Sequence, residues 1–313
     1  MGAEIALSLA LRQGGDTSVT LWGRSQHSLD NAKVRIEQAG NFMVAEHLID
    51  TATKQQALDI ITYTTHMQQA SHQADFIIEA VAEDIALKQD ILKQAEIYVP
   101  SQAVLSSTTS AIGAGDMQSV LQRPENFVIA HYAQPAHLVA VVEVVLGEKS
   151  DVKTGEMVTE ILTSCGKKPV NCPDIPGFFW ARIQHAILRE CVSMVERGLM
   201  RPADCDTILK SGYGSRLPAM GSFEHADLAG IDLILSPAAQ QVWQDLSNIS
   251  NPMDTIMGNM LAQGNTGMRS GQGFYNWADG KADTFKQKRD QEIVKRAKIN
   301  AGGEIVITNK QGT

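Results

Sequence analysis

Two ionisable residues near the middle of the chain, His131 and Glu143, have the types and the spacing that acid–base chemistry requires. His131 ends the apolar run 127–131, and Glu143 is the only charged residue in the apolar run 139–146. Imidazole titrates near neutral pH, so a histidine can accept the proton of an alcohol during oxidation. A carboxylate in an apolar strand needs a partner, because burying a lone charge costs several kcal/mol. We therefore predict that Glu143 fixes the tautomer of His131 and stabilises its imidazolium form, as in a catalytic triad. The alternative is a structural histidine and an unrelated glutamate at a strand end.

Strands and helices alternate in the part of the chain that must position these two residues. The sequence predicts an opening helix that Gly14–Gly15 stops, and strands at Val19–Trp22, 60–63, 75–81, 103–107, 127–131 and 139–146, with helices over 28–49 and 85–98. Such alternation implies parallel β-α units and a doubly wound α/β sheet. After residue 174, helical periodicity dominates, with helices predicted at 177–198, 202–211, 222–235, 238–247, 253–263 and 281–300. We predict a Rossmann domain over 1–173 and an all-α domain over 174–313.

The first two residues, Met1 and Gly2, match the end of a dinucleotide-binding motif. In a Rossmann fold a first strand runs into a glycine-rich turn and then a helix, whose N-terminus binds the pyrophosphate. If Gly2 is the last glycine of that turn, the opening helix is the phosphate-binding helix. The first strand and two earlier glycines are then expected upstream of Met1.

Residues Gly23, Arg24 and Ser25 follow the strand Val19–Trp22 and bear on the choice of cofactor. In this fold an acidic residue at the end of the second strand accepts the ribose 2′-hydroxyl and selects NAD. A guanidinium and a hydroxyl can instead bind a 2′-phosphate. The sequence therefore favours NADP over NAD. Arg24 as an ordinary surface residue is one alternative, and stacking of Arg24 on adenine, which fits NAD, is another.

Composition excludes several classes of partner. The net charge of −8 argues against nucleic-acid binding, which needs a basic face. No apolar stretch reaches the length of a membrane span, and the first residues do not resemble a secretory signal. The four cysteines (Cys165, Cys172, Cys191 and Cys205) form no CxxC pair, so we predict no metal site and no redox dithiol. Reduced thiols are typical of a cytoplasmic protein.

Six motifs are spread over nearly the whole chain. They are Met1–Gly2, DFIIEAVAE at 75–83, SSTTS at 106–110, His131 with Pro135 and Glu143, DIPGF at 174–178, and SGQGFY at 270–275. Together they resemble those of the L-3-hydroxyacyl-CoA dehydrogenase family, whose members include 3-hydroxybutyryl-CoA dehydrogenases, lambda-crystallin with gulonate dehydrogenase, and carnitine dehydrogenase. The resemblance implies a Rossmann domain, a helical domain that mediates homodimerisation, an active site between the two, and a role in fatty acid metabolism.

The same resemblance implies roles for individual residues. Thr109 matches the family's substrate-contacting serine, and Ser110 is the alternative because the following loop differs in length by one residue. A hydroxyl here can bond the substrate oxygen or the nicotinamide. The expected cofactor-binding positions in this part of the chain are Ala82, Glu83, Lys88 and Ser107. Turn capping by the hydroxyls and a solvated Glu83–Lys88 pair are the simpler explanations.

Two positions depart from the family pattern. Ala181 stands where an asparagine usually helps to hold the substrate carbonyl, and Gln134 replaces an asparagine beside Pro135. Loss of one such donor costs on the order of 100-fold in rate.

The predicted function is NAD(P)-dependent interconversion of a short-chain 3-hydroxyacyl-CoA and a 3-ketoacyl-CoA. The only basic residues between positions 25 and 58 are Lys33, Arg35 and Lys54, so recognition of CoA has little support there. The alternatives are a dehydrogenase of the same family that acts on a hydroxy acid or hydroxy-amine without CoA, and a weakly active, crystallin-like homologue.

Overall fold

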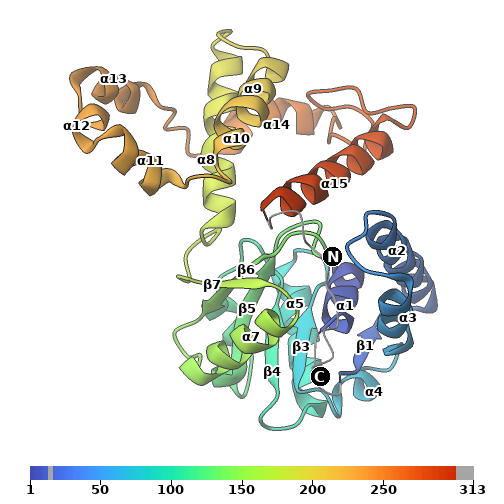
Figure 1. Ribbon diagram of the computed structural model, residues 1–313. Helices are drawn as coiled ribbons and strands as arrows, with labels where there is room; N and C mark the ends of the chain where they lie inside the picture. The colour runs from blue at the N-terminus through green and yellow to red at the C-terminus, as the bar shows by residue number, and fades with distance from the viewer. Residues whose placement is uncertain (13–16, 301–313) are drawn as a thin grey trace. The chain divides into compact units, whose positions relative to one another are not determined.

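The computed structural model describes residues 1–12 and 17–300. The chain divides into two compact units (Figure 1). The first contains Met1–Arg182 and the C-terminal segment from Asp290, and the second contains Ile183–Arg289. The domain boundary at residue 174 stays a prediction, and the predicted helix stop at Gly14–Gly15 lies outside the described residues.

The first unit is an α/β fold. Its strands are β1 (Val19–Trp22), β2 (Ile61–Thr64), β3 (Phe76–Glu79), β4 (Val104–Ser107), β5 (Phe127–Tyr132), β6 (Val141–Leu146) and β7 (Lys168–Cys172). Its helices are α1 (Gly2–Ala10), α2 (Gln26–Ala45), α3 (Thr51–Asp59), α4 (Met67–Ser71), α5 (Ile85–Tyr98), α6 (Ala114–Gln118) and α7 (Val152–Ser164), with a 3-10 turn η1 (Pro124–Asn126).

The second unit is predominantly helical. Helix α8 (Trp180–Glu196) starts in the first unit and continues into the second. Helix α15 (Lys281–Asn300) starts in the second unit and ends in the first. Between them lie α9 (Pro202–Ile208), the π-helical turn η2 (Leu209–Tyr213), α10 (Gly214–Arg216), α11 (Ser222–Ala229), α12 (Ile231–Ile234), α13 (Pro237–Asp245), η3 (Pro252–Asp254) and α14 (Ile256–Ala262).

The strands form two sheets, and nearly all their pairings are parallel, as predicted. β1 pairs with β2, and the other five strands have the order β3-β4-β5-β6-β7. β3, β4 and β5 are parallel, whereas β6 is antiparallel to β5. The connection 133–140 is too short for a parallel crossover, which needs a dozen residues or more, so the chain turns back on itself. This hairpin carries both His131 and Glu143.

The five-stranded sheet is covered on both faces, which explains why β5 and β6 consist of continuous apolar runs. Successive side chains along a strand point to opposite faces, so each strand contributes to two cores. One core contains residues of β4, β5 and β6 with α5 and α6 (Leu105, Phe127, Ile129, Val145, Leu92 and Met117). The other contains their neighbours with α7 (Val104, Val128, Ala130, Val142, Val144, Val158 and Leu162). Glu143 interrupts this apolar pattern.

A third core forms where α1 packs against α2 and α3, which Figure 1 shows side by side. Leu7, Ile36 and Met43 are buried in it. Val294 of α15 is buried in the same core, and the Lys298 ammonium donates to the carbonyl of Glu46. The last helix therefore completes the first unit, although its charged sequence carries no signal of this packing.

Several elements of the first unit were not among those predicted: the short α3, α4, α6 and η1, the longer helix α7, and strand β7. Helix α7 contains Gly155 and three threonines, all poor helix formers, which weakens its signal. Strand β7 contains Pro169, which is tolerated because β7 lies at the edge of the sheet. The strand at Val19–Trp22 and the helix at 85–98 are confirmed without change. Among the described residues, no helix has the length and hydropathy that crossing a bilayer requires.

Candidate active site

His131 and Glu143 face each other across the β5–β6 hairpin. The antiparallel register places them directly opposite, so both side chains lie on the same face of the sheet. His131 Nδ1 lies 2.7 Å from Glu143 Oε2. The two residues are only 7% and 3% exposed. Because the carboxylate accepts from Nδ1–H, the Nε2 atom of His131 is left to exchange a proton with a substrate.

The other carboxylate oxygen of Glu143 is also fully engaged. Oε1 accepts hydrogen bonds from the backbone N–H of Phe179 at 2.9 Å and of Trp180 at 2.8 Å, and from the thiol of Cys172 at 3.4 Å. These N–H groups lie at the start of α8, where the helix dipole favours an anion. Burial raises the pKa of Glu143, but the hydrogen bonds from His131, Trp180 and Phe179 outweigh it and lower the pKa overall. Glu143 is therefore ionised at neutral pH.

The turn between β7 and α8 brings those N–H groups to the carboxylate. Gly177 and Phe178 have φ values of 76° and 47°, so two successive residues adopt the left-handed conformation that glycine tolerates best. Asp174 anchors the turn by accepting from the N–H groups of Ala114 at 2.8 Å and Gly115 at 3.0 Å. The buried Phe178 ring lies 5.7 Å from the His131 ring, between centroids. The turn thus holds both members of the His131–Glu143 pair.

A second polar group, the Lys88 cluster (Glu79, Glu83, Lys88, Ser107 and Thr109), lies at the ends of β3 and β4 and on α5. Lys88, 1% exposed, places its ammonium 3.1 Å from both oxygens of Glu79 and 3.3 Å from Glu83. The Ser107 hydroxyl donates to Glu79 at 2.6 Å. Burial raises the pKa of Glu83, yet Thr109 and Lys88 lower it overall. The Glu83 side chain is 44% exposed, but Lys88 is buried and also paired with Glu79, so Glu83 and Lys88 are more than a solvated surface pair.

The hydroxyl of Thr109 is saturated within the Lys88 cluster. It donates to Glu83 at 2.5 Å and accepts from the N–H groups of Ala111 and Ile112 at 3.3 and 3.0 Å. A hydroxyl has one proton and two lone pairs, so no capacity remains for a substrate in this arrangement. Ser110 is exposed, and within the described part of the chain its hydroxyl makes no hydrogen bond, although its N–H donates to Glu83 at 3.1 Å. Of the two predicted substrate contacts, Ser110 is the one with a free hydroxyl.

Replacement of Lys88 by methionine is expected to destabilise the protein by about 3–5 kcal/mol, because it leaves the Glu79 carboxylate buried without a counter-charge. Urea unfolding at pH 7 measures the change in the free energy of unfolding. Lys286→Met is the matched control, since its ion pair with Asp283 is exposed and contributes little. Equal unfolding midpoints for the two variants would contradict the structural role of Lys88.

The N-terminus of α1 has the position that a dinucleotide-binding helix requires. The helix starts at Gly2, with Met1 as N-cap and no side-chain hydrogen bond to its first N–H groups. A Cβ added to Gly2 would lie 3.5 Å from the Cβ of Ala80, just beyond the end of β3. The first turn of α1 therefore adjoins the carboxyl end of the sheet, where nucleotides bind in this fold. These residues fit NAD, whose pyrophosphate Met1 and Gly2 would hold.

The remaining predicted cofactor residues lie on exposed loops. Ala82 is in the loop after β3, and Arg24 follows β1. Ser25 is the N-cap of α2, where its hydroxyl accepts from the N–H of Ser28 at 3.3 Å. A Cβ on Gly23 would lie 2.7 Å from the Ser28 hydroxyl and 2.8 Å from a methyl of Leu29, so the tight turn favours glycine there. Arg24 and Ser25 belong neither to the His131–Glu143 pair nor to the Lys88 cluster.

Sequence reasoning missed three residues of this region: Glu79, Cys172 and Asp174. Glu79 carried a usable signal, because it is a carboxylate at the end of an apolar strand. The same kind of signal, a carboxylate within an apolar strand, identified Glu143. Asp174 begins the DIPGF motif, but the motif alone does not show that this carboxylate accepts from the N–H groups of Ala114 and Gly115. Cys172 had no signal, since its partner is set by the pairing of β7 with β6.

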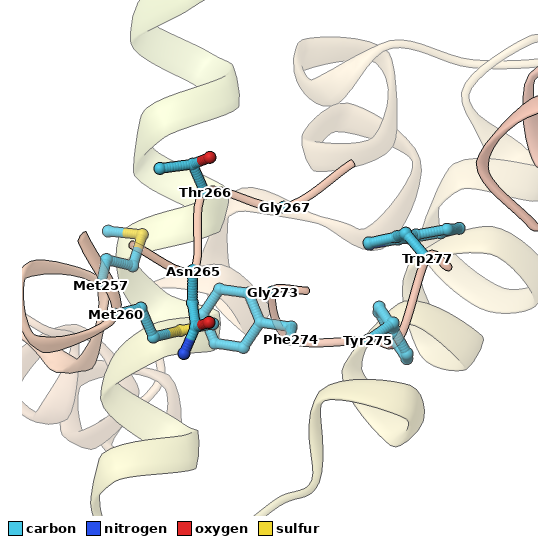
Figure 2. Close-up of a pocket in the computed structure, with 9 residues that line it drawn as sticks. All are labelled: Met257, Met260, Asn265, Thr266, Gly267, Gly273, Phe274, Tyr275 and Trp277. Carbon is cyan, nitrogen blue, oxygen red and sulfur yellow. The ribbon is translucent and has the colours of Figure 1, made fainter. Parts of the chain in front are cut away.

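A cavity of about 320 Å³ lies entirely within the second unit. Figure 2 shows Met257, Met260 and Phe274 at one side of it and Tyr275 and Trp277 at the other. The Tyr275 hydroxyl donates to Asp206 at 2.8 Å. None of the predicted site residues lines this cavity.

Two family models match the sequence. The model of the 3-hydroxyacyl-CoA dehydrogenase NAD binding domain covers residues 1–175, and that of the 3-hydroxyacyl-CoA dehydrogenase C-terminal domain covers residues 177–277.

Individual relatives include enzymes with and without CoA in their names. A probable 3-hydroxybutyryl-CoA dehydrogenase of Deinococcus radiodurans is 31% identical over 88% of this chain and 96% of its own. The 5-formyl-3-hydroxy-2-methylpyridine 4-carboxylate 5-dehydrogenase of Mesorhizobium japonicum is 29% identical over 88% of this chain and 90% of its own. A crystal structure of an enzyme of that name, described as an NAD+-dependent dismutase, has a TM-score of 0.88 at 27% identity and covers 97% of this chain and 96% of its own.

Proposed function

The chain belongs to the 3-hydroxyacyl-CoA dehydrogenase family, and from this premise we propose that it oxidises the 3-hydroxyl group of a short-chain 3-hydroxyacyl-CoA and catalyses the reverse reduction. Its N-terminal part is an NAD-binding domain, as NAD-dependent oxidoreductase chemistry requires.

His131 is the proposed general base. Bound NAD supplies the hydride acceptor. Nε2 of His131 takes the hydroxyl proton as the alcohol becomes a ketone, and it returns the proton in the reverse direction. Glu143 holds Nδ1–H, keeps Nε2 unprotonated before the reaction and stabilises the imidazolium afterwards. The free hydroxyl of Ser110 is the proposed donor to the substrate oxygen.

The observation that carries this proposal is the 2.7 Å contact between His131 and an ionised, nearly buried Glu143. An ordinary buried histidine can be satisfied by a backbone carbonyl and needs no charge. Retention of a carboxylate inside an apolar strand, with four donors directed at it, is costly unless a charge develops on its partner.

Reduction of acetoacetyl-CoA, followed by the loss of nicotinamide absorbance, tests the proposed reaction. We expect turnover that depends on His131 and that is faster with one of the two reduced cofactors, NADH or NADPH. No turnover with either cofactor, from protein shown to bind it, would favour the crystallin-like alternative.

Arg24 is the proposed determinant of cofactor choice. Gly23 supplies no carboxylate for the ribose 2′-hydroxyl, and Arg24 is exposed directly after it. Because a guanidinium binds a 2′-phosphate well, we expect Arg24→Ala to raise the KM for NADPH more than that for NADH. Equal effects on both would show that Arg24 does not determine the choice between the two cofactors.

A substrate without CoA is the second candidate. Phe179 and Trp180 are 61% and 40% exposed, although their N–H groups are bound to Glu143. Two exposed aromatic residues, whose backbone N–H groups bind the carboxylate partner of the proposed base, favour a substrate with a planar ring, such as a pyridine aldehyde or an aryl hydroxy acid. Comparison of kcat/KM for acetoacetyl-CoA and for a pyridine aldehyde, in the wild type and in Phe179→Ala, separates the two candidates.

A homodimer is the proposed assembly. Helices α11, α12 and α13 carry large exposed apolar side chains, among them Phe223, Leu228, Leu233, Val242 and Trp243. Apolar surfaces of this kind mark protein interfaces. Light scattering after size exclusion measures the mass, and a monomeric mass at micromolar concentration would refute the assignment.

A further inference from the structure

The thiol of Cys172 is one of the donors to the Glu143 carboxylate, and no function follows for it from the family. Cys172 is the last residue of β7, and its Cα pairs with Val145 of the neighbouring β6. Its Sγ lies 3.4 Å from Glu143 Oε1, the oxygen that does not contact His131. The side chain is half-buried.

The thiol stays protonated around neutral pH. Burial and the adjacent Glu143 carboxylate raise the pKa of Cys172 to about 11. A thiol with so high a pKa is a poor nucleophile and a poor site for oxidation. What remains for it chemically is to act as a hydrogen-bond donor to the carboxylate.

We propose that Cys172 is a positioning residue that tunes the basicity of the His131–Glu143 pair through the Glu143 carboxylate. This inference rests on the proposed function, because it assigns Cys172 a part in the action of the proposed base. The thiol hydrogen draws negative charge toward Oε1 and so reduces the charge on Oε2 that faces His131. A weaker acceptor at Oε2 stabilises the imidazolium less and so favours the neutral imidazole that acts as the base.

The groups that face the Glu143 carboxylate come from four elements. They are His131 on β5, Cys172 on β7, the N–H of Phe179 in the turn, and the N–H of Trp180 on α8. Of these, only His131 and Cys172 titrate. Since the backbone donors cannot be removed by substitution, Cys172 is the donor to Oε1 that a side-chain change can alter.

Two variants of Cys172 test the proposal by the direction of a pH shift. In Cys172→Ala the donor is lost, and the acid limb of kcat/KM for alcohol oxidation is expected to move up by roughly 0.3 pH units, a fraction of the unit or so that one hydrogen bond shifts a carboxylate. In Cys172→Ser a hydroxyl restores the donor, and the midpoint is expected at or below the wild-type value. Cys191→Ala, which removes a thiol from α8 in the second unit, is the matched control and should leave the profile unchanged.

Unchanged midpoints in both variants, or shifts of the same sign and size, would overturn the proposal and leave Cys172 a packing residue. A readout without turnover separates this failure from a failure of the proposed function. NMR titration of the labelled His131 ring in the wild type and in Cys172→Ala reports the same shift if the coupling exists, whatever reaction the protein catalyses. If the NMR titration shifts but the protein has no dehydrogenase activity, the proposed function is refuted, and with it the catalytic role of Cys172. The electrostatic coupling between Cys172 and His131 would still stand.

Discussion

Replacement of His131 by glutamine is expected to lower kcat for 3-hydroxyacyl-CoA oxidation by about 10³- to 10⁴-fold, the upper part of the range that general acid–base catalysis supplies. Glutamine keeps a polar side chain opposite Glu143, so the fold of the hairpin is preserved. It cannot accept the hydroxyl proton, and the negative charge of Glu143 then has no imidazolium to stabilise. The loss is expected in kcat and in kcat/KM alike, because the interaction forms in the transition state.

Steady-state kinetics with 3-hydroxybutyryl-CoA and NAD, together with the titration of NADH fluorescence, check this result. NADH affinity should be unchanged, because α1 and the Lys88 cluster are untouched. His66→Gln, on an exposed residue before α4, is the control for a histidine substitution in the same unit. Full activity in His131→Gln would remove His131 from the mechanism.

Replacement of Glu143 by glutamine is expected to lower kcat by about 10³-fold or more, by analogy with the loss of the acid in a serine-protease triad. The amide is neutral, and one of the two acceptor oxygens is replaced by an NH₂ group that can only donate. The carboxylate of the wild type accepts from the N–H groups of Phe179 and Trp180 as well as from His131. The amide therefore fails both to stabilise the imidazolium and to fix the tautomer of His131. Rapid-quench measurement of a single turnover distinguishes slowed chemistry from slowed product release.

The same variant gives a stability signature with a defined sign. The pKa of Glu143 is lowered in the folded state from its ordinary value of 4.5. Its ionised form therefore stabilises the fold above about pH 4.5, and this contribution is lost as the pH falls through the folded-state pKa. Wild type should be more stable than Glu143→Gln at pH 7, and the difference should shrink below pH 4.5. A difference independent of pH would show that the substitution acts through packing alone.

Much of the first unit follows from residue patterns. Apolar runs bounded by polar turns predicted the position of β1, and the buried charge of Glu143 predicted its pairing with His131. The antiparallel direction of β6 was not predicted, because an apolar run does not show in which direction a strand runs. Only the short connection between β5 and β6 indicates that direction. The sequence also placed Thr109 first among the substrate contacts, whereas its hydroxyl is bonded to Glu83.

Other parts of the site had no readable signal. Backbone N–H groups are present at every residue except proline, so the two that hold Glu143 could not be distinguished before the turn at Gly177 and Phe178 was known. The Lys88 cluster was readable in principle. Glu79 interrupts an apolar strand as Glu143 does. Lys88 lies in the first turn of α5, which follows β3 after one short loop.

The buried position of Val294 has a consequence for biosynthesis. The first unit consists of two stretches of chain separated by the whole of the second unit, so α1, α2 and α3 meet their last partner only after residues 183–289 have been made. Domains generally fold as they emerge from the ribosome, N-terminal parts first. Here the core formed by α1, α2 and α3 lacks Val294 until the closing helix has been made. The first unit therefore reaches its complete packing only near the end of synthesis.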